Sequence, residues 1–355
     1  MSNKKIVFAS LPGADNEPTV DNFRCEACDP APSPGDGELT IQTLYISLDP
    51  AIRCRMNTDT GVEYMSAWSA GDLVLGLGGV GMVTESNVDQ YAPGDLVQPM
   101  VNWPWVEKFS ARADDKLFTL YKIEESLREQ PHLVLSLLGL TGLTAFLGIT
   151  QRGHISPGAN QTCVVSGAAG ATGNLAGQIA KLGGCKRVVG ICGSDEKCEH
   201  LRTELGFDAT VNYKQSDISE ALRQTCPNGI DVYFDNVGGT ISETVIKQMN
   251  PDSHVILCGQ IAVYNKDLPY PPPISEEIQA VIKERNITRE RFLVLTYQEK
   301  FQEGLKQLQE WYMGGQLKVP EFVHEGIESA PEAFVNMMTS VKQTRVGKQL
   351  VCVNK

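Results

Sequence analysis

The stretch that most constrains the fold is QTCVVSGAAGATGNLAGQIAKL at residues 161–182. It opens with the apolar run Cys163–Val165, which is typical of a strand buried on both faces. Small residues follow, and Ala171–Leu182 has the apolar spacing of a helix. A strand, a glycine turn and a helix in this order predict a dinucleotide-binding turn. Glycine lets the backbone approach a pyrophosphate, and the N-terminus of the helix offers N–H groups.

The glycine spacing alone would equally fit an ordinary tight turn, but the chain after it favours the nucleotide-binding interpretation. A second strand is expected at Val188–Gly193, where the adenosine ribose of a dinucleotide would be met. Further strands are expected at 208–212, 230–235, 253–258 and 291–297, and helices at 195–205, 217–225 and 240–249. This alternation predicts an α/β fold with a doubly wound parallel sheet of the Rossmann kind.

Residues 1–127 have a different pattern from the part that follows. Short strand-like runs at 5–10, 38–47 and 79–86 are separated by glycine and proline, which predicts an antiparallel, β-rich domain. The tail is expected to complete this domain with a helix at 330–339 and a final strand. We therefore expect a discontinuous β-rich catalytic domain from 1–127 and 315–355, and a Rossmann domain from 128–314.

Two features of the β-rich part leave alternatives open. The glycine-rich run Gly76–Gly81 favours a bent or bulged strand over a nucleotide-binding turn, because no helix follows it. The segment Trp103–Trp105 is a rigid aromatic turn that could line a pocket or fill a core.

Composition and charge argue against several classes of function. The chain has 355 residues, 42% of them hydrophobic, and a formal net charge of −12, which disfavours nucleic acid or an anionic membrane as the main partner. No run has the length of a signal peptide or a membrane span, so a cytoplasmic protein is expected. Several of the ten cysteines lie in apolar runs, as buried thiols do (Cys163, Cys192, Cys258 and Cys352).

Metal-dependent chemistry is also disfavoured. The pair Cys25 and Cys28 has no second pair at zinc-finger distance, so structural zinc is not expected. The first histidine along the chain is His132, so residues 1–131 offer no imidazole to a catalytic zinc. We expect hydrogen bonds to a developing oxyanion to take the place of a metal.

The turn after the second strand indicates which nicotinamide cofactor is used. An NAD-specific site would place an acidic residue at the end of that strand, but here Asp195 and Glu196 come late and Lys197 follows one turn into the helix. A lysine there can neutralise a 2′-phosphate, and Tyr213 can add a phenol hydrogen bond. NADPH is therefore favoured over NADH, although a lysine on a helix is more often simply solvated.

Long stretches of the chain resemble zinc-free members of the medium-chain dehydrogenase/reductase superfamily, whose catalytic domain is GroES-like. They are most similar to the leukotriene B4 dehydrogenase and prostaglandin reductase group, and within it to the 15-oxoprostaglandin 13-reductases. The matching stretches are TLYISLDP (43–50), RCRMN (53–57), VVSGAAGATG (164–173), GSDEKC (193–198), DVYFDNVGG (231–239), ILCGQIAVYNKDLPYPPP (256–273) and ITRERFLV (287–294). The resemblance covers nearly the whole chain.

The resemblance implies roles for individual residues. The phenol of Tyr264 would donate a hydrogen bond to an enone oxygen while hydride from NADPH reaches the β-carbon, and solvent would then protonate the α-carbon. Without the resemblance, Tyr264 would be taken for an ordinary loop tyrosine. Cofactor contacts are implied for Gly170, Ala171, Thr172, Gly173, Lys197, Tyr213, Asn236, Cys258, Gly259, Gln260, Ile261, Tyr264, Phe292, Leu293, Val294 and Arg345, and substrate contacts for Val101, Asn102, Tyr264, Leu293 and Val294.

The chain departs from the group at two places. Residues 100–102 replace aromatic residues expected before the tryptophan segment, and the loop at 340–347 is longer than its counterpart. Arg345 stands about where an asparagine would contact the cofactor. Either change would alter the preferred chain length of the substrate without changing the reaction.

The resemblance implies reduction of the 13,14 double bond of 15-keto-prostaglandins such as 15-keto-prostaglandin E2, and hence a place in prostaglandin, fatty acid and lipid metabolism. The alternatives are a quinone or general enone oxidoreductase, a non-catalytic NADPH-binding protein and a carrier of hydrophobic ligands. A small lipid enone is the expected partner. The chain is expected to be a monomer or a homodimer, with the segment 291–297 as a candidate dimer edge.

Overall fold

The computed structural model describes residues 3–13, 15–61, 65–266, 268–269, 271–339 and 345–354. The chain divides into two compact units. The first unit comprises Met1–Gly139, Phe322–Gln343 and Gln349–Lys355, and the second comprises Leu140–Glu321 and Thr344–Lys348. The domain boundaries expected after residues 127 and 314 stay predictions. Within the described part of the chain, no helix is both long enough and apolar enough to cross a membrane.

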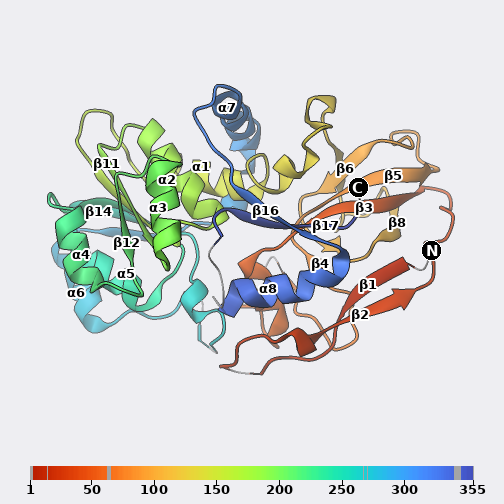
Figure 1. The fold of residues 1–355 in the computed structure, drawn as a ribbon, viewed down its shortest axis with the longest axis horizontal. Helices are drawn as coiled ribbons and strands as arrows, with labels where there is room; N and C mark the ends of the chain where they lie inside the picture. The colour runs from red at the N-terminus through yellow and green to blue at the C-terminus, as the bar shows by residue number, and fades with distance from the viewer. Residues whose placement is uncertain are drawn as a thin grey trace. The chain divides into compact units, whose positions relative to one another are not determined.

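The second unit is built on a six-stranded sheet whose strands are all parallel (Figure 1). The strand order is β12-β11-β10-β13-β14-β15, so the order reverses at β10. The strands are β10 (Thr162–Ser166), β11 (Arg187–Cys192), β12 (Ala209–Asn212), β13 (Ile230–Asp235), β14 (Met249–Leu257) and β15 (Thr288–Arg291). The doubly wound parallel sheet predicted from the sequence is confirmed.

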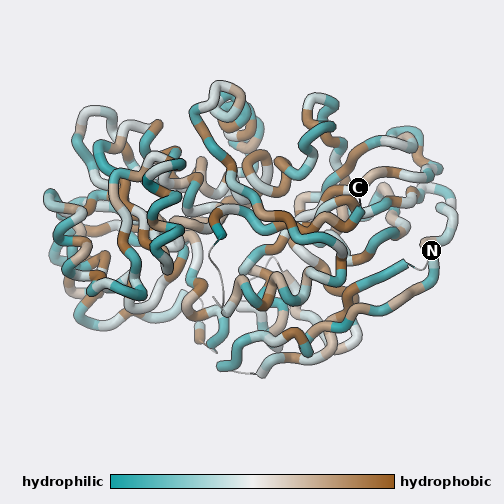
Figure 2. The backbone as a smooth tube through the Cα atoms, viewed as in Figure 1, coloured by the Kyte–Doolittle hydropathy of each residue, from teal (hydrophilic) through white to brown (hydrophobic). Residues whose placement is uncertain are grey.

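Helices cover the sheet in two groups. The helices are α1 (Leu140–Arg152), α2 (Ala171–Leu182), α3 (Asp195–Thr203), α4 (Ile218–Thr225), α5 (Gly239–Ile246), α6 (Glu276–Glu284) and α7 (Phe301–Met313). Helix α1 packs against α2 and α7, while α5 packs against α4 and α6. Leu222, Val245 and Ile278 of the second group form one core with sheet residues such as Val164. Figure 2 shows apolar and polar residues alternating along the helices, which suits one buried face on each.

The segment 291–297 is not the strand that the sequence predicts. The strand β15 ends at Arg291, where it pairs with Leu257 of β14, and Val294–Lys300 forms 3₁₀ turns (η6). The apolar residues that suggested a strand, Phe292 and Val294, are buried beyond its end. The strand itself is polar because it forms the edge of the sheet.

The first unit is made of antiparallel strands and confirms the predicted β-rich domain. Its largest sheet has the order β16-β17-β3-β5-β6-β9, with β8 also on β3, and two small sheets pair β1 with β2 and β4 with β7. The elements are β1 (Asn3–Phe8), β2 (Phe23–Cys28), β3 (Glu38–Ser47), β4 (Leu75–Gly76), β5 (Gly79–Ser86), β6 (Leu96–Pro99), β7 (Trp103–Pro104), β8 (Lys108–Arg112), β9 (Leu120–Lys122), β16 (Glu321–Glu325), α8 (Ala330–Thr339) and β17 (Lys348–Cys352). The tail completes this sheet, because β17 pairs with β3.

The tryptophan segment belongs to the core of the first unit. Trp103 and Trp105 are both 0% exposed. A Cβ atom added to Gly79 would lie 2.1 Å from the ring of Trp103, and one added to Gly76 would lie 2.5 Å from Nε1 of Trp105. The glycines of the run 76–81 therefore make room for two indole rings, and the run is divided between β4 and β5.

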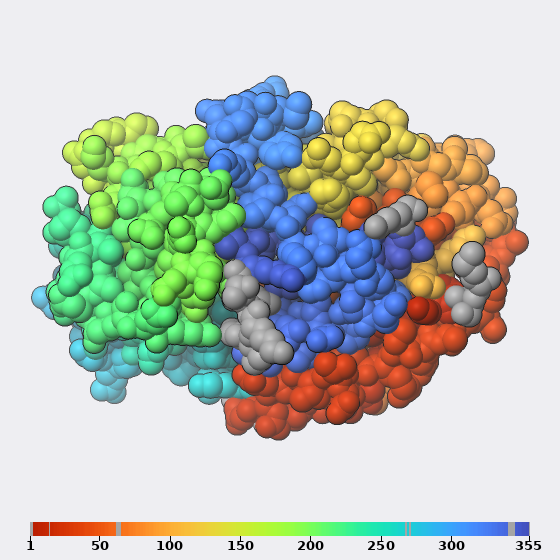
Figure 3. All heavy atoms as spheres, in the orientation of Figure 1, coloured from red at the N-terminus to blue at the C-terminus, as the bar shows by residue number. Residues whose placement is uncertain are grey.

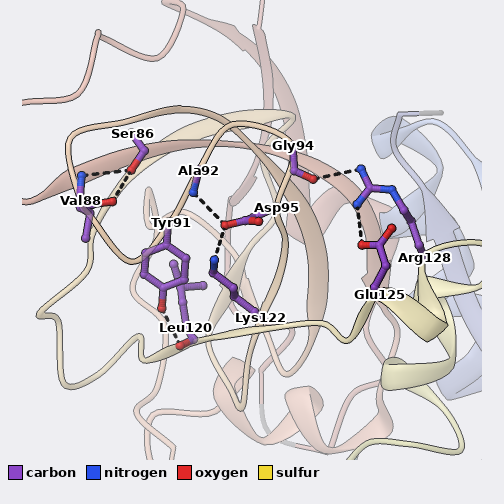
Figure 4. Close-up of polar contacts among 10 residues, drawn as sticks. All are labelled: Ser86, Val88, Tyr91, Ala92, Gly94, Asp95, Leu120, Lys122, Glu125 and Arg128. Atoms are coloured by element: carbon purple, nitrogen blue, oxygen red, sulfur yellow. Dashed lines mark hydrogen bonds and ion pairs between the residues drawn. The ribbon is translucent and has the colours of Figure 1, made fainter.

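A turn between β5 and β6 is tied to strand β9 by polar contacts (Figure 4). The Asp95 carboxylate accepts hydrogen bonds from the backbone N–H of Ala92 (2.8 Å) and from the Lys122 ammonium (2.7 Å). The hydroxyl of Tyr91 donates to the carbonyl oxygen of Leu120 (2.9 Å). The two donors lower the pKa of Asp95 below its ordinary value.

Candidate functional site

The turn between β10 and α2 is closed so tightly that only glycine fits at its contact points. Gly167 has a φ of +58°, a conformation that side chains disfavour. A Cβ atom added to Gly173 would lie 2.4 Å from the carbonyl oxygen of Gly167. Gly170 occupies the N-cap position of α2 and makes no side-chain cap. The first-turn N–H groups of α2, beginning at Ala171 and Thr172, thus form a site suited to an anion.

The C-terminal segment of the second unit passes this turn. The backbone N–H of Gly347 donates to the carbonyl oxygen of Ala169 (2.8 Å), and Gly347 forms a parallel bridge with Gly170. Arg345 is exposed and lies two residues before this contact. The predicted loop at 340–347 falls partly on residues 340–344, which lie outside the described residues.

The turns after β11 and β12 bring Lys197 and Tyr213 to one end of the sheet. The side chain of Ser194 caps α3 by accepting from the backbone N–H of Lys197 (3.3 Å). A Cβ atom added to Gly193 would lie 2.9 Å from the hydroxyl of Tyr213, so glycine permits this close approach. Figure 3 shows residues of α2 and α3, coloured green, at the surface of this unit.

The charges at this end favour a phosphate. Asp195 is held by the side-chain amide of Asn212, which donates to its carboxylate (2.8 Å). Burial and the nearby ammonium of Lys214 lower the pKa of Lys197, with Cys192 acting in the opposite direction. No carboxylate is among the groups that shift the pKa of Lys197. Lys214 was missed by the sequence interpretation, although it follows Tyr213 directly.

The turn after β13 carries Asn236 against the end of β10. The side-chain amide of Asn236 donates to the carbonyl oxygen of Ser166 (2.8 Å), and its backbone N–H donates to the hydroxyl of Ser166 (3.0 Å). The preceding residue, Asp235, is 0% exposed. It was not predicted to matter, although a carboxylate that ends an apolar strand is an unusual feature.

The loop after β14 carries the predicted catalytic tyrosine. The backbone N–H groups of Cys258 and Gly259 both donate to the carbonyl oxygen of Asp235 (2.9 and 3.0 Å), which fixes the start of the loop. The backbone N–H of Gln260 donates to the phenol oxygen of Tyr264 (3.3 Å). Tyr264 is half-buried and ends the 3₁₀ turn Ile261–Val263 (η5). Burial raises the pKa of Cys258 to about 12, so this thiol is neutral.

The residues after β15 complete the same edge of the sheet. The backbone N–H of Phe292 donates to the carbonyl oxygen of Leu257 (2.9 Å), and its ring stacks on Tyr297 at 5.5 Å. Leu293 is half-buried and Val294 is buried. All these turns follow the C-terminal ends of parallel strands, where doubly wound sheets bind their ligands. We call them the carboxyl edge of the sheet.

Val101 and Asn102, the predicted substrate contacts, belong to the first unit. Asn102 has a φ of +70°, and its side-chain oxygen accepts from Arg55 (2.5 Å) while its side-chain amide donates to the carbonyl oxygen of Leu117 (3.2 Å). Asn102 is therefore engaged within its own unit. Its role toward a substrate, like that of Val101, stays a prediction.

The cysteines are present as free thiols. Cys163, Cys192 and Cys352 are buried as predicted, and Cys258 is half-buried. Cys25 and Cys28 lie in strand β2. In the part of the chain that the structure describes, no three His, Cys, Asp or Glu residues are grouped as metal ligands would be.

Two family models match the chain. The model described as the N-terminal domain of oxidoreductase matches residues 4–117, and the model described as zinc-binding dehydrogenase matches residues 171–310. With the relatives reported next, these matches show that the chain belongs to the zinc-binding dehydrogenase type of medium-chain oxidoreductases. The zinc-free site expected from the sequence stays a prediction.

Three relatives extend over nearly the whole chain. YfmJ of Bacillus subtilis strain 168 is 40% identical over 355 residues, covering 99% of this chain and 98% of its own. The NADPH-dependent curcumin reductase of Escherichia coli strain K12 is 33% identical over 353 residues, covering 99% and 97%. Prostaglandin reductase 1 of Rattus norvegicus is 36% identical over 344 residues, covering 94% of each chain.

A solved structure confirms the fold. CurA of Vibrio vulnificus in complex with NADPH superposes with a TM-score of 0.88 at 31% identity, and the match covers 99% of each chain. Both a curcumin reductase and CurA thus bind or use NADPH on a chain similar to this one.

Proposed function

We propose that this protein is an NADPH-dependent reductase that acts on the carbon–carbon double bond of an enone. The order of functional groups along the carboxyl edge carries the proposal. Lys197 and Tyr213 lie after β11 and β12, the glycine turn follows β10, and Asn236 and Tyr264 follow β13 and β14. Because β10 is the central reversal point, this order suits the 2′-phosphate, the pyrophosphate and the nicotinamide of one extended cofactor.

The chain's own residues fit NADPH. The space beside Gly173 is too small for a side chain, as expected where a backbone must turn under a pyrophosphate. The charged pair Lys197 and Lys214 suits a 2′-phosphate, and Arg345 adds a cation near the glycine turn. The remaining proposed cofactor contacts are Gly170, Ala171, Thr172, Tyr213, Asn236, Cys258, Gly259, Gln260, Ile261, Tyr264, Phe292, Leu293 and Val294.

Tyr264 is the proposed catalytic residue. Its phenol oxygen accepts a hydrogen bond from the backbone N–H of Gln260, and a phenol is chemically able to accept and to donate. Bound NADPH would supply the hydride for the β-carbon of the enone. Tyr264 would donate to the enone oxygen, where negative charge develops, and so lower the barrier. Solvent would then protonate the α-carbon.

We propose 15-keto-prostaglandins as the substrates, with reduction of the 13,14 double bond. The motifs of the chain resemble those of prostaglandin reductase 2, and prostaglandin reductase 1 is among the relatives. Such an enzyme would act in lipid metabolism in the cytoplasm, as a monomer or a homodimer. The curcumin reductase of Escherichia coli is 33% identical, against 36% for the rat prostaglandin reductase 1, and curcumin is another conjugated ketone. A broader enone specificity is therefore the second candidate.

Steady-state rates on a small panel of acceptors test this proposal. The panel consists of 15-keto-prostaglandin E2, curcumin and an ortho-quinone, each with NADPH and with NADH. We expect turnover of 15-keto-prostaglandin E2 with NADPH and little with NADH. Comparable turnover of curcumin and 15-keto-prostaglandin E2 would favour the broader enone specificity. Turnover of curcumin alone would contradict the prostaglandin assignment, and turnover of the quinone alone would contradict enone reduction.

A further inference from the structure

The carboxylate of Asp235 collects hydrogen bonds from around the end of strand β13. The side chain is 0% exposed. Its Oδ1 atom accepts from Ser166 Oγ (3.1 Å), Tyr233 Oη (2.8 Å), Val237 N (3.1 Å) and Gly238 N (2.9 Å), and its Oδ2 atom accepts from Ser242 Oγ (2.7 Å) and Gln260 Nε2 (3.4 Å).

All of these partners are donors, which suits an acceptor-only carboxylate. The six hydrogen bonds of Asp235 come from uncharged groups. A charged neighbour, the guanidinium of Arg289, interacts with it electrostatically: Asp235 raises the pKa of Arg289, while burial lowers it more. Burial and the neighbouring Asp235 raise the pKa of Tyr233 well above its ordinary value, which keeps its hydroxyl a donor. A buried carboxylate without such donors would be strongly unfavourable, so the network holds its members in place.

The network joins segments that carry the proposed reaction. Ser166 ends β10, and its hydroxyl also accepts a hydrogen bond from the backbone N–H of Asn236. Gln260 is 1% exposed and lies in the loop after β14, where its backbone N–H donates to the phenol of Tyr264. Two short paths of contacts therefore run from Asp235, one through Ser166 to Asn236 and one through Gln260 to Tyr264.

We propose that Asp235 is a positioning residue that fixes Asn236 and the Tyr264 loop for hydride transfer, an inference that rests on the proposed function. Because its side chain is 0% exposed, it would act through these neighbours rather than on a bound molecule. Its effect is confined to the nicotinamide end of the carboxyl edge, because Lys197 and Tyr213 lie on the other side of β10.

Asp231 provides a matched control on the same strand. It lies at the amino end of β13, where its carboxylate accepts from the backbone N–H of Thr162 (2.7 Å) and the side-chain amide of Asn250 (2.8 Å). Substitution by Asn at either position changes one carboxylate into an amide of the same size. A general loss of stability would follow from both substitutions, whereas a loss of positioning would follow only from Asp235→Asn.

The experiment compares Asp235→Asn, Asp231→Asn and the unmodified protein by three readouts. Amide hydrogen exchange of residues 236–239 and 258–264 is measured without ligand, affinity for adenosine 2′,5′-bisphosphate probes the phosphate end, and kcat is measured with NADPH and 15-keto-prostaglandin E2. For Asp235→Asn we expect faster exchange in both segments and a kcat roughly 10- to 100-fold lower, the effect typical of losing a hydrogen bond to a charged group. Bisphosphate affinity should stay unchanged. Asp231→Asn should change neither loop exchange nor kcat.

A folded Asp235→Asn protein with unchanged loop exchange would overturn the inference. If this variant does not fold, Ser242→Ala replaces it, because this substitution removes one donor to Asp235 and leaves the carboxylate in place. Faster amide exchange at 258–264 in Ser242→Ala would support the positioning role, and unchanged exchange would contradict it. If the unmodified protein does not reduce enones, the proposed function fails. The exchange measurement still shows whether Asp235 holds the loop.

Discussion

Tyr264 gains its proposed role from the backbone around it. Nothing in the residues near it in sequence distinguishes it from other loop tyrosines, and the resemblance to a family alone singled it out. The structure adds the contact with the backbone N–H of Gln260, which orients the phenol at the carboxyl edge. The sequence could not show the buried network of Asp235, because Ser166 and Gln260 are distant along the chain and reach it only in the folded sheet.

Replacing Tyr264 by Phe should lower kcat and leave NADPH binding nearly intact. The loss of one donor to a developing oxyanion costs about 2.7–4 kcal/mol at most, and less where solvent substitutes. The matched control is Tyr213→Phe at the phosphate end, which should weaken NADPH binding and leave kcat nearly unchanged. Stopped-flow hydride transfer and fluorescence titration measure the two effects. An unchanged kcat in Tyr264→Phe would remove this residue from the mechanism.

Replacing Lys197 by Ala should weaken the binding of NADPH but not of NADH. A charge-assisted contact to the 2′-phosphate is expected to be worth roughly 10- to 100-fold in affinity. Lys306→Ala on the exposed surface of α7 is the control. Isothermal titration with both cofactors measures the difference. Equal losses for NADPH and NADH would show that Lys197 does not recognise the phosphate.

The pH dependence of NADPH binding follows from the same lysine. Burial lowers the pKa of Lys197, so its ammonium loses its proton at a lower pH than an ordinary lysine. Affinity for NADPH should therefore be full below this pKa and fall as pH rises through it, while affinity for NADH stays level. Titration of both cofactors across the alkaline range checks this, and a parallel fall for both would contradict it.

At the level of elements, the sequence predicted best where apolar periodicity and burial agree. Strands β3, β5 and β13 and helix α2 have the predicted bounds, because most of their apolar residues are buried. The strand predicted at 291–297 is wrong because Phe292 and Val294 are buried in the connection that follows the edge strand. The role of Gly76 and Gly79 was likewise hidden, since it depends on two indole rings that follow more than twenty residues later.

The turn that begins α2 should not tolerate Ala at Gly173. The added Cβ would lie 2.4 Å from the carbonyl oxygen of Gly167 and 2.9 Å from Cα of Ala168, and backbone atoms cannot move away cheaply. We expect a loss of about 1–3 kcal/mol in stability together with weaker NADPH binding. Gly177→Ala on the same helix clashes with the ring of Phe207 instead, so it should destabilise without changing NADPH affinity. Equal affinities in both variants would contradict the role of the turn.

Replacing Asp95 by Asn, in the turn between β5 and β6, should lower the stability of the protein. Its two donors lower the pKa of Asp95, so the stabilisation is present above the unfolded pKa and is lost as pH falls through the lower, folded value. We expect a loss of about 1 kcal/mol at neutral pH that shrinks in acid. Thermal unfolding of the variant and the unmodified protein, at neutral pH and in acid, measures this loss of stability. Asp114→Asn, at an exposed ion pair with Arg112, should have a smaller effect. A pH-independent difference for Asp95→Asn would contradict this assignment.

At the scale of the whole molecule, the sequence predicted a discontinuous β-rich domain, whose two segments precede and follow the Rossmann domain along the chain. The structure shows both architectures, and the C-terminal strand β17 pairs with β3 although more than three hundred residues separate them. Such a pairing has no local signal. The chemistry proposed for the second unit depends on several turns that lie at one edge of the sheet. It is therefore best tested through the reaction itself rather than through one residue.

Hydride transfer from NADPH to the enone is tested by following deuterium from the cofactor into the product. The protein is incubated with 15-keto-prostaglandin E2 and with NADPH deuterated at either face of C4, and the product is analysed by mass spectrometry and NMR. We expect that one of the two cofactors transfers deuterium to C13 and that the C15 ketone is retained. Deuterium at C15, or no reduction while NADPH remains tightly bound, would contradict it.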